Sequence, residues 1–123
     1  MSTFVTVKSA DLKGAALDWA VALVERQHVV LAAPAYGNGW RVRYDLLHTQ
    51  DKYSPSSCWK QGGPLIDKHV LQLKFYQHEH PDTAWRANAH DGWGEGATPL
   101  IAACRAIVAS VLGEAAPVPE ELT

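Results

Sequence analysis

The chain has 123 residues, enough for one domain that buries roughly two-thirds of its unfolded surface without a metal or disulfide. Its 47% hydrophobic and 20% charged residues exclude an intrinsically disordered protein. Thirteen acidic and 11 basic residues leave a net charge of −2, which provides no broad positive surface for duplex nucleic acid.

The cysteine content and the amino-terminal residues indicate the cellular compartment in which the protein is expected to act. Two cysteines, Cys58 and Cys104, are too few for a secreted disulfide framework, which favours a reducing environment. Residues 1–7 lack the basic and apolar regions of a signal peptide, and no run reaches the ~18 apolar residues of a membrane span. We therefore expect a cytoplasmic protein without a membrane anchor.

The first elements in chain order are a short strand and a helix. Alternation over residues 4–7 predicts the strand, and Ser9 or Asp11 is expected to cap the helix that follows. Apolar residues between positions 12 and 24 cover more than half of the helix circumference, which predicts a largely buried helix. Trp19 lies in this stripe, so we expect it in the core rather than on a ligand-binding surface.

The middle of the chain combines two strands with a long irregular segment. Residues 29–31 and 40–44 are typical of strands, and residues 34–39 between them include a Gly-Asn-Gly turn. Periodicity disappears between residues 47 and 63, where Ser, Pro, Gly and Gln dominate. A loop of this length is uncommon in a compact domain, and this favours a functional role.

A hairpin and a glycine-rich segment precede the last helix. Residues 70–76 and 83–87 predict two antiparallel strands joined by residues 78–82. The sequence Gly-Trp-Gly-Glu-Gly at 92–96 is expected to form a loop leading into a helix at residues 98–112. Thr98 is the expected N-cap of that helix, Pro99 its first residue, and Gly113 the residue after its end.

The last helix has two different faces. One is apolar, and the other carries Ala102, Ala106 and Ala109, interrupted by Arg105, and permits close packing against another element. Residues 115–123 contain two prolines and two glutamates and are expected to lie on the surface or fray. We therefore expect a single α+β domain over residues 1–114 with a short tail. Its predicted architecture is a small, mainly antiparallel sheet packed by an N-terminal and a C-terminal helix, similar to a sandwich.

The sequence gives little support to metal binding or catalysis. His78 and His80 can share one face of a strand, but no third ligand stands at a recognised spacing, so we expect no metal site and no cofactor. The chain also lacks a nucleophile elbow or a comparable cysteine signature. A non-enzymatic role is therefore favoured, and a small hydrolase is the least favoured class.

Two segments that combine glycine with tryptophan are candidate ligand sites. In residues 53–64 the tryptophan is Trp59, and in residues 92–96 it is Trp93. Glycine backbones can approach an anion closely, and an indole can stack on a base. Alternatively, both tryptophans only cover a sheet edge while the glycines make turns. Glu95 disfavours phosphate in the second segment, so the predicted ligand site lies in the first: Tyr53, Ser54, Trp59, Lys60, Gln61, Gly62, Gly63 and Pro64.

Three segments carry a resemblance to a known family. They are SADLKGAALDWAVA at residues 9–22, YSPS at 53–56 with Trp59 and QGGPLI at 61–66, and TPLIAA at 98–103 with Arg105, followed by VAS, LGE and VPEEL between 108 and 122. In this order and spacing the chain resembles the NinX-like accessory proteins of tailed phages, a family without an established activity. Residues 70–96 carry no part of the resemblance.

The resemblance implies a phage protein that acts in the cytoplasm of its bacterial host. We expect a non-enzymatic binding module that forms a homo-oligomer and sequesters a small nucleotide-like ligand through residues 53–64. The alternative is a protein-interaction inhibitor of a host defence protein, which would act through the same loop or through the alanine face of the last helix. Genomic lifestyle rather than any residue supports the anti-defence role.

Overall fold

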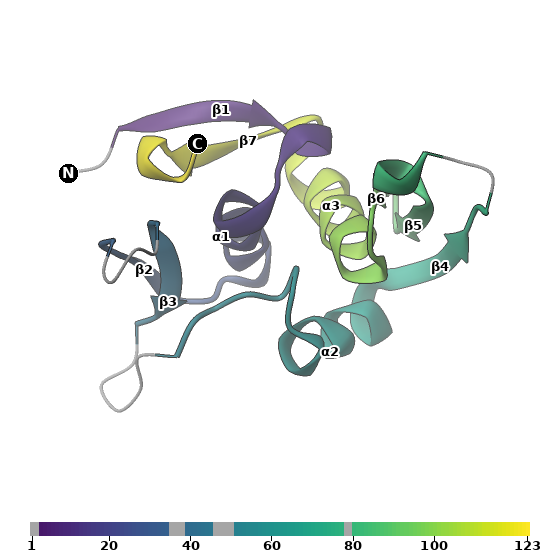
Figure 1. The fold of residues 1–123 in the computed structure, drawn as a ribbon, viewed down its shortest axis with the longest axis horizontal. Helices are drawn as coiled ribbons and strands as arrows, with labels where there is room; N and C mark the ends of the chain where they lie inside the picture. Colours follow the sequence, from purple (N-terminus) through teal and green to yellow (C-terminus); the bar gives the residue numbers. More distant parts are fainter. Residues whose placement is uncertain (1–2, 35–38, 46–50, 78–79) are drawn as a thin grey trace.

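The computed structural model describes residues 3–34, 39–45, 51–77 and 80–123 (Figure 1). Three α-helices are present in these ranges: α1 (Gly14–Glu25), α2 (Trp59–His69) and α3 (Pro99–Leu112). The strands are β1 (Phe4–Lys8), β2 (Val29–Ala32), β3 (Arg41–Tyr44), β4 (Val70–Phe75), β5 (Trp85–Ala89), β6 (Gly92–Gly96) and β7 (Ala115–Pro119). Short 3-10 turns are η1 (Ser9–Asp11), η2 (Pro81–Thr83) and η3 (Glu120–Leu122).

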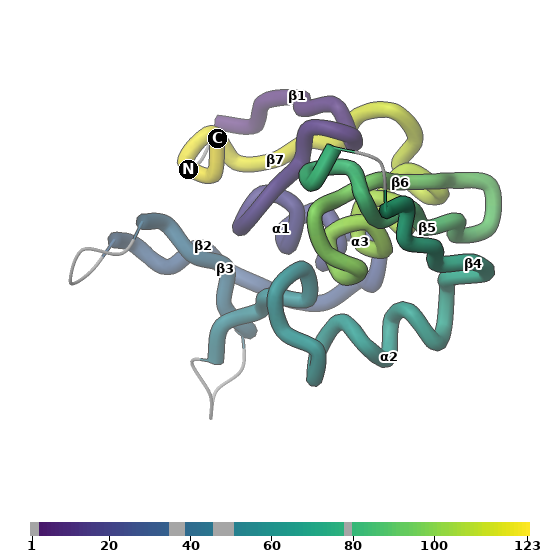
Figure 2. Tube along the Cα trace, turned by 45° about the vertical axis from the view of Figure 1, so that its right-hand side comes forward, coloured from purple at the N-terminus to yellow at the C-terminus, as the bar shows by residue number. Residues whose placement is uncertain are grey.

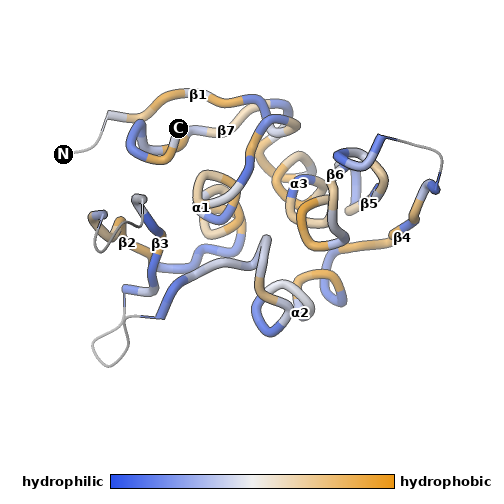
Figure 3. The backbone as a smooth tube through the Cα atoms, in the orientation of Figure 1, coloured by the Kyte–Doolittle hydropathy of each residue, from blue (hydrophilic) through white to orange (hydrophobic). Residues whose placement is uncertain are grey.

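The fold is mixed α+β with antiparallel strand pairing, as predicted. The strands form three small sheets rather than one, with the orders β1-β7, β2-β3 and β4-β5-β6. Figure 1 shows α1 and α3 in the middle of the molecule, β1 and β7 on one side of them, and the β4-β5-β6 sheet on another. In Figure 3 the hydrophobic colouring covers much of these two central helices and continues on β1 and β4. The core is therefore organised around helices, and the sheets surround it.

Helix α3 is covered on nearly all sides. Thr98 Oγ1 accepts a hydrogen bond from Ile101 N at 3.1 Å, Pro99 is the first residue, and Gly113 follows the helix with a φ of 82°. These three predicted end signals are confirmed. The apolar face contacts α1, and the alanine face contacts β5 and β6.

The glycine-rich segment is strand β6, so the prediction of a loop at 92–96 is wrong. The glycines at 92, 94 and 96 point toward α3, and a Cβ added to Gly94 would lie 2.6 Å from Ala106 N. Only glycine lets the strand backbone approach the helix this closely. Ala102 and Ala106 of the alanine face are therefore buried beneath β6 and cannot serve as the docking surface suggested by the sequence, whereas Ala109 is half-buried.

The chain ends are paired, so the prediction of a fraying tail is wrong. Residues 115–119 form β7, which pairs with β1 from Lys8↔Ala115 to Phe4↔Pro119, and Figures 1 and 2 both show the two strands side by side. Pro117 and Pro119 are two residues apart, so their backbone nitrogens face the same side of β7. That side faces away from β1, and pairing with β1 therefore does not require the N–H group that proline lacks. Ala116 and Val118, between and beside them, are fully buried.

The amino-terminal helix begins without the predicted cap. Lys13 precedes α1 and makes no side-chain capping bond. Ser9 lies in η1 instead, where its Oγ donates to Gly113 O at 2.6 Å and ties the two ends of the chain together. Trp19 is half-buried against the core and lies 6.4 Å from the Phe4 ring, in agreement with its predicted structural role.

The remaining elements agree with the sequence in part. Strands β2 and β3 pair as an antiparallel hairpin, and so do β4 and β5. Parts of their predicted connections, residues 35–38 and 78–79, lie outside the described residues, and so does His78. Residues 47–50 of the loop predicted at 47–63 also lie outside the described residues, and the prediction is wrong from Trp59 onward, where α2 begins. Across the described ranges, the helices are too short or too polar to span a bilayer.

Candidate functional site

The first half of the predicted ligand site is buried. Tyr53 and Ser54 are only 5% and 8% exposed, and the turn that follows them packs against α1. Asp18 Oδ1 of α1 accepts a hydrogen bond from Ser56 N at 2.9 Å. Burial raises the pKa of the Asp18 carboxyl, and the hydrogen bonds from Ser56 oppose this only in part. Residues 53–56 therefore join helices rather than face a ligand.

The second half of the predicted site belongs to helix α2. Gln61 is engaged with the chain itself, because its Oε1 accepts from Ser54 N and its Nε2 donates to Lys52 O at 2.8 Å. The Gly62 N–H donates to Cys58 O at 2.8 Å, so it is not presented to a ligand as predicted. A Cβ on Gly62 would lie 2.6 Å from Leu100 Cδ2 of α3, which explains the glycine by packing.

The exposed remainder of that site is a patch on α2. Trp59 is 58% exposed, Lys60 and Pro64 are exposed, and Gly63 is half-buried. The three segments that carry the family resemblance thus meet through α1, the 54–57 turn, α2 and α3. Their side chains mostly hold the core together. A ligand at Trp59 and Lys60 stays a prediction.

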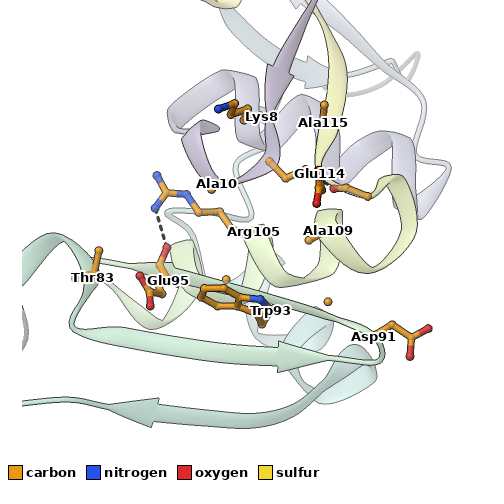
Figure 4. A pocket seen from close by; sticks show the side chains of 14 residues that line it. Lys8, Ala10, Thr83, Asp91, Trp93, Glu95, Arg105, Ala109, Glu114 and Ala115 are labelled. Carbon is orange, nitrogen blue, oxygen red and sulfur yellow. Dashed lines mark hydrogen bonds between the residues drawn. The ribbon is translucent and has the colours of Figure 1, made fainter.

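A larger concavity lies on the other side of α3. It is a groove of about 890 Å³ between the free edge of β6, the η1 turn and the α3–β7 connection (Figure 4). We call it the β6 groove. Its lining residues are Lys8, Ser9, Ala10, Thr83, Asp91, Gly92, Trp93, Gly94, Glu95, Arg105, Ala109, Gly113, Glu114 and Ala115. This volume is within the range of about 300–1,000 Å³ typical of ligand sites.

Arg105 shapes one end of the groove. Its Nη1 donates to Glu95 O at 2.7 Å, and its Nε donates to Leu12 O at 2.8 Å. Burial lowers the pKa of the guanidinium, while Asp11 acts in the opposite direction. Figure 4 shows the guanidinium reaching from α3 across the groove to the strand. Arg105 therefore fastens β6 to the amino-terminal segment and directs the Glu95 carbonyl toward the groove.

Trp93 provides the main exposed apolar surface of the groove. Its side chain is 57% exposed, on the face of β6 opposite the glycines that contact α3. Arg86 of β5 lies over the indole at 5.5 Å and over the Tyr76 ring at 4.9 Å. Arg86 Nε also donates to Glu95 Oε1 at 3.1 Å. The indole is thus held by a cation–π contact yet remains accessible to a ligand.

The charges lining the groove favour a cationic ligand over an anionic one. Asp91, Glu95 and Glu114 contribute three carboxylates against the two cations Lys8 and Arg105. Arg105 already donates to two backbone carbonyl oxygens. The described residues include no cluster of three or more His, Cys, Asp or Glu side chains suited to a metal ion.

A second polar cluster joins α1, α2 and the β5–β6 turn. His69 Nε2 lies 2.8 Å from Glu25 Oε2, and His69 Nδ1 lies 3.3 Å from His90 Nε2. Lys68 Nζ is 3.2 Å from the other Glu25 oxygen. Burial tends to raise the pKa of Glu25, but the hydrogen bonds from His69 and Lys68 outweigh it and the pKa is lowered.. None of these four residues lines the groove, and the cluster links three elements.

Sequence reasoning identified Trp93 and its glycines as a candidate site but gave preference to the Trp59 segment. The signal for the groove was the alternation Gly-Trp-Gly-Glu-Gly, because a period of two places all three glycines on one face of a strand. Because glycine is also typical of loops, the strand at residues 92–96 was not predicted. Lys8, Ala10 and Glu114 approach β6 only through tertiary folding, and no local pattern predicts them.

Comparison with known proteins identifies the family to which the chain belongs. A search of the curated proteins finds no significant match to the chain. The family model described as Bacteriophage P22, NinX matches residues 8–111, a range that contains α1, α2, strand β6 and all of α3 except Leu112. Because this match covers most of the chain, the protein belongs to the NinX family of bacteriophage P22.

Proposed function

We propose that the protein is a non-enzymatic binding module of the phage that acts in the host cytoplasm and holds a segment of a host protein in the β6 groove. The observation that carries this proposal is the groove itself, an open concavity with an exposed tryptophan beside a free strand edge. Exposed tryptophans surrounded by polar groups are common anchors of protein interfaces. Inhibition of a host defence protein is one outcome that such binding would produce.

The walls of the groove support a protein segment over a nucleotide. Ala10, Ala109 and Ala115 give a smooth lining, and carboxylates outnumber cations. A nucleotide phosphate would need unopposed positive charge or several free backbone N–H groups at a helix N-terminus. The nucleotide hypothesis instead rests on Trp59 and Lys60 of α2, and a separate titration tests it.

The proposal is tested by blocking the groove. Ala10→Trp fills the groove from η1, where the native side chain is exposed and a larger one is tolerated. Ala33→Trp, at an exposed position outside the groove lining, is the matched control. In pull-downs from host lysate, we expect one stoichiometric host protein to be retained by the wild type and by Ala33→Trp and lost with Ala10→Trp.

A second pair of variants separates the two tryptophans. Loss of the host protein with Trp93→Ala but not with Trp59→Ala supports the groove, and the reverse result would transfer the site to α2. Calorimetric titration with signalling nucleotides tests the remaining alternative, for which Trp59→Ala is expected to abolish any heat. Sedimentation of the free protein checks the expected homo-oligomer.

A further inference from the structure

We propose that the partner segment binds as an additional β-strand along the free edge of β6, extending the β4-β5-β6 sheet to four strands. This inference rests on the function proposed above and specifies how the groove recognises its ligand. In this binding mode, main-chain hydrogen bonds supply affinity, and alternate side chains supply specificity.

The hydrogen-bonding direction of β6 follows from its pairing. Ala89 pairs with Gly92 across the two-residue turn His90-Asp91, and the register continues through Ala87↔Gly94 to Trp85↔Gly96. A two-residue turn is closed by a hydrogen-bonded pair, and such pairs alternate along an antiparallel ladder. The glycines of β6 therefore bond to β5, and the main-chain groups of Trp93 and Glu95 point away from it.

Arg105 provides independent support for this direction. Its Nη1 donates to Glu95 O from the groove side. Because the N–H and C=O of one strand residue point to the same side, the Glu95 N–H also faces the groove, together with both main-chain groups of Trp93. In the described part of the chain, β5 is the only strand paired with β6.

Strands β4 and β7, at two other sheet edges, carry features that discourage pairing, and the residues of β6 do not. Strand β4, at the opposite edge of the same sheet, has an irregular register between Val70 and Gln72 and an exposed Lys74. Strand β7 carries Pro117 and Pro119, which lack N–H groups on its outer side. Irregularities, lysines and prolines are the usual protection of an edge. Strand β6 itself has only glycine, tryptophan and glutamate, and the bond from Arg105 to Glu95 O leaves both main-chain groups of Trp93 and the Glu95 N–H for a partner strand.

The shape of the groove selects a single extended segment rather than a second copy of the protein. The η1 turn and the α3–β7 connection form a wall opposite β6, and α3 contributes Arg105 and Ala109 between them (Figure 4). A neighbouring strand requires a spacing of about 4.8 Å, and the wall consists largely of the small residues Ser9, Ala10, Gly113 and Ala115. Another folded domain approaching edge to edge would meet this wall.

The lining also defines the chemistry of the segment. Side chains of an added strand would alternate between the face of α3, where Ala109 favours small apolar residues, and the face that carries Trp93 and Glu95. On that second face, the indole and the carboxylates Asp91 and Glu114 favour basic residues. The expected ligand is an extended peptide in which small apolar and basic residues alternate.

The probe is an array of synthetic peptides of about eight residues, in which Ala or Val alternates with Arg, Lys or Tyr. Binding is measured by fluorescence anisotropy, with Ala10→Trp as the blocked control. We expect the best peptides to bind the wild type, to lose binding with Ala10→Trp, and to slow amide exchange at Trp93 and Glu95. Absence of binding by every peptide would overturn both this inference and the preferred peptide chemistry of the groove.

A proline substitution tests the main-chain contact separately. Glu95→Ala and Glu95→Pro both remove the carboxylate, but only Glu95→Pro removes the N–H that faces the groove. Because this N–H does not bond to β5, we expect both variants to fold, with Glu95→Pro binding about tenfold more weakly than Glu95→Ala. Equal binding by both variants, with Ala10→Trp still blocking, would contradict strand addition and leave groove binding intact.

N-methylation of the peptide provides the second measurement and decides the question if Glu95→Pro fails to fold. A strand bonded along one edge uses the N–H groups of alternate residues. We expect methylation at one alternating set of positions to abolish binding and methylation at the other set to be tolerated. Tolerance at every position would contradict strand addition.

Discussion

At the scale of single residues, the most consequential interaction is that between Asp18 and the turn at Ser56. The carboxyl is 3% exposed, and its Oδ1 accepts from Ser56 N. Burial raises its pKa above the ordinary value of 3.8 because the charged form is poorly solvated in the core. Asp18 therefore joins α1 to the turn by hydrogen bonding while its charge opposes folding.

The first prediction concerns this charge. Asp18→Asn keeps an acceptor for Ser56 N and removes the charge, so we expect its free energy of unfolding at pH 7 to equal or exceed that of the wild type. Asp18→Ala removes the acceptor as well and is expected to lose about 1–3 kcal/mol. Urea denaturation of the three proteins measures both effects.

The pH dependence of stability shows whether the Asp18 charge stabilises or destabilises the fold. The cost of the Asp18 charge is absent below the ordinary pKa of 3.8 and appears as pH rises through the higher folded-state pKa. The stability of the wild type relative to Asp18→Asn should therefore increase as pH falls through this window. A difference that does not change with pH would show that the carboxyl is not shifted as described.

At the scale of elements, the contact between β6 and α3 decides the architecture of the groove. Three glycines at alternate positions allow the strand to lie directly on the alanine face of the helix. The two other residues of the strand are thereby directed outward, where they meet Arg86. The close packing and the exposed tryptophan are two results of the same alternation.

The second prediction tests this packing. A Cβ on Gly94 would lie 2.6 Å from Ala106 N and 2.8 Å from Ala102 O, both backbone atoms that cannot rotate away. Gly94→Ala is therefore expected to lower the free energy of unfolding by about 1–3 kcal/mol, the usual cost of overpacking. The measurement is chemical denaturation.

The matched control is Gly39→Ala, before β3. Position 39 is exposed, a Cβ there would have no atom within 4 Å, and the backbone is not in the positive-φ region that strains other residues. Surface substitutions of this kind usually change stability by no more than about 0.5 kcal/mol, so this variant should be as stable as the wild type. Equal effects of the two substitutions would contradict the close packing of β6 on α3.

At the scale of the whole molecule, the chain ends close the fold. Strand β7 pairs with β1, Ser9 bonds to Gly113, and the buried Val118 belongs to the same hydrophobic cluster as Leu17 of α1 and Cys104 of α3. These contacts also place Lys8, Ala10 and Glu114 on the far wall of the groove. The last residues therefore contribute to both the core and the candidate site.

The third prediction follows from this closure. Truncation after Glu114 removes β7 and uncovers the core, so we expect loss of cooperative unfolding. Cys104 is the reporter, because its thiol is 1% exposed and burial raises its pKa, which suppresses the reactive thiolate. The Cys104 thiol should react slowly with a thiol reagent in the full chain and rapidly after truncation. Cys58→Ser in both proteins removes the other thiol and gives a clean signal.

Local sequence determined the elements whose signals lie within them. The apolar stripes of α1 and α3, the cap residues Thr98 and Gly113, and the alternation of the paired strands were sufficient to predict an α+β fold. The three segments of the resemblance were sufficient to predict the family. These features depend on neighbours a few residues apart, for which hydrophobic period and capping are direct physical causes.

Tertiary structure decided the segments whose conformation depends on distant partners. Gly92–Gly96 is a strand because the alanine face of α3 accepts it, and residues 115–119 form a strand because β1 pairs with them. Position 62 of α2 requires a glycine because Pro55 and Leu100 leave no space for a side chain there. Glycine and proline permit several conformations locally, so long-range packing selects among them, and with that selection it places the groove at β6 rather than at Trp59.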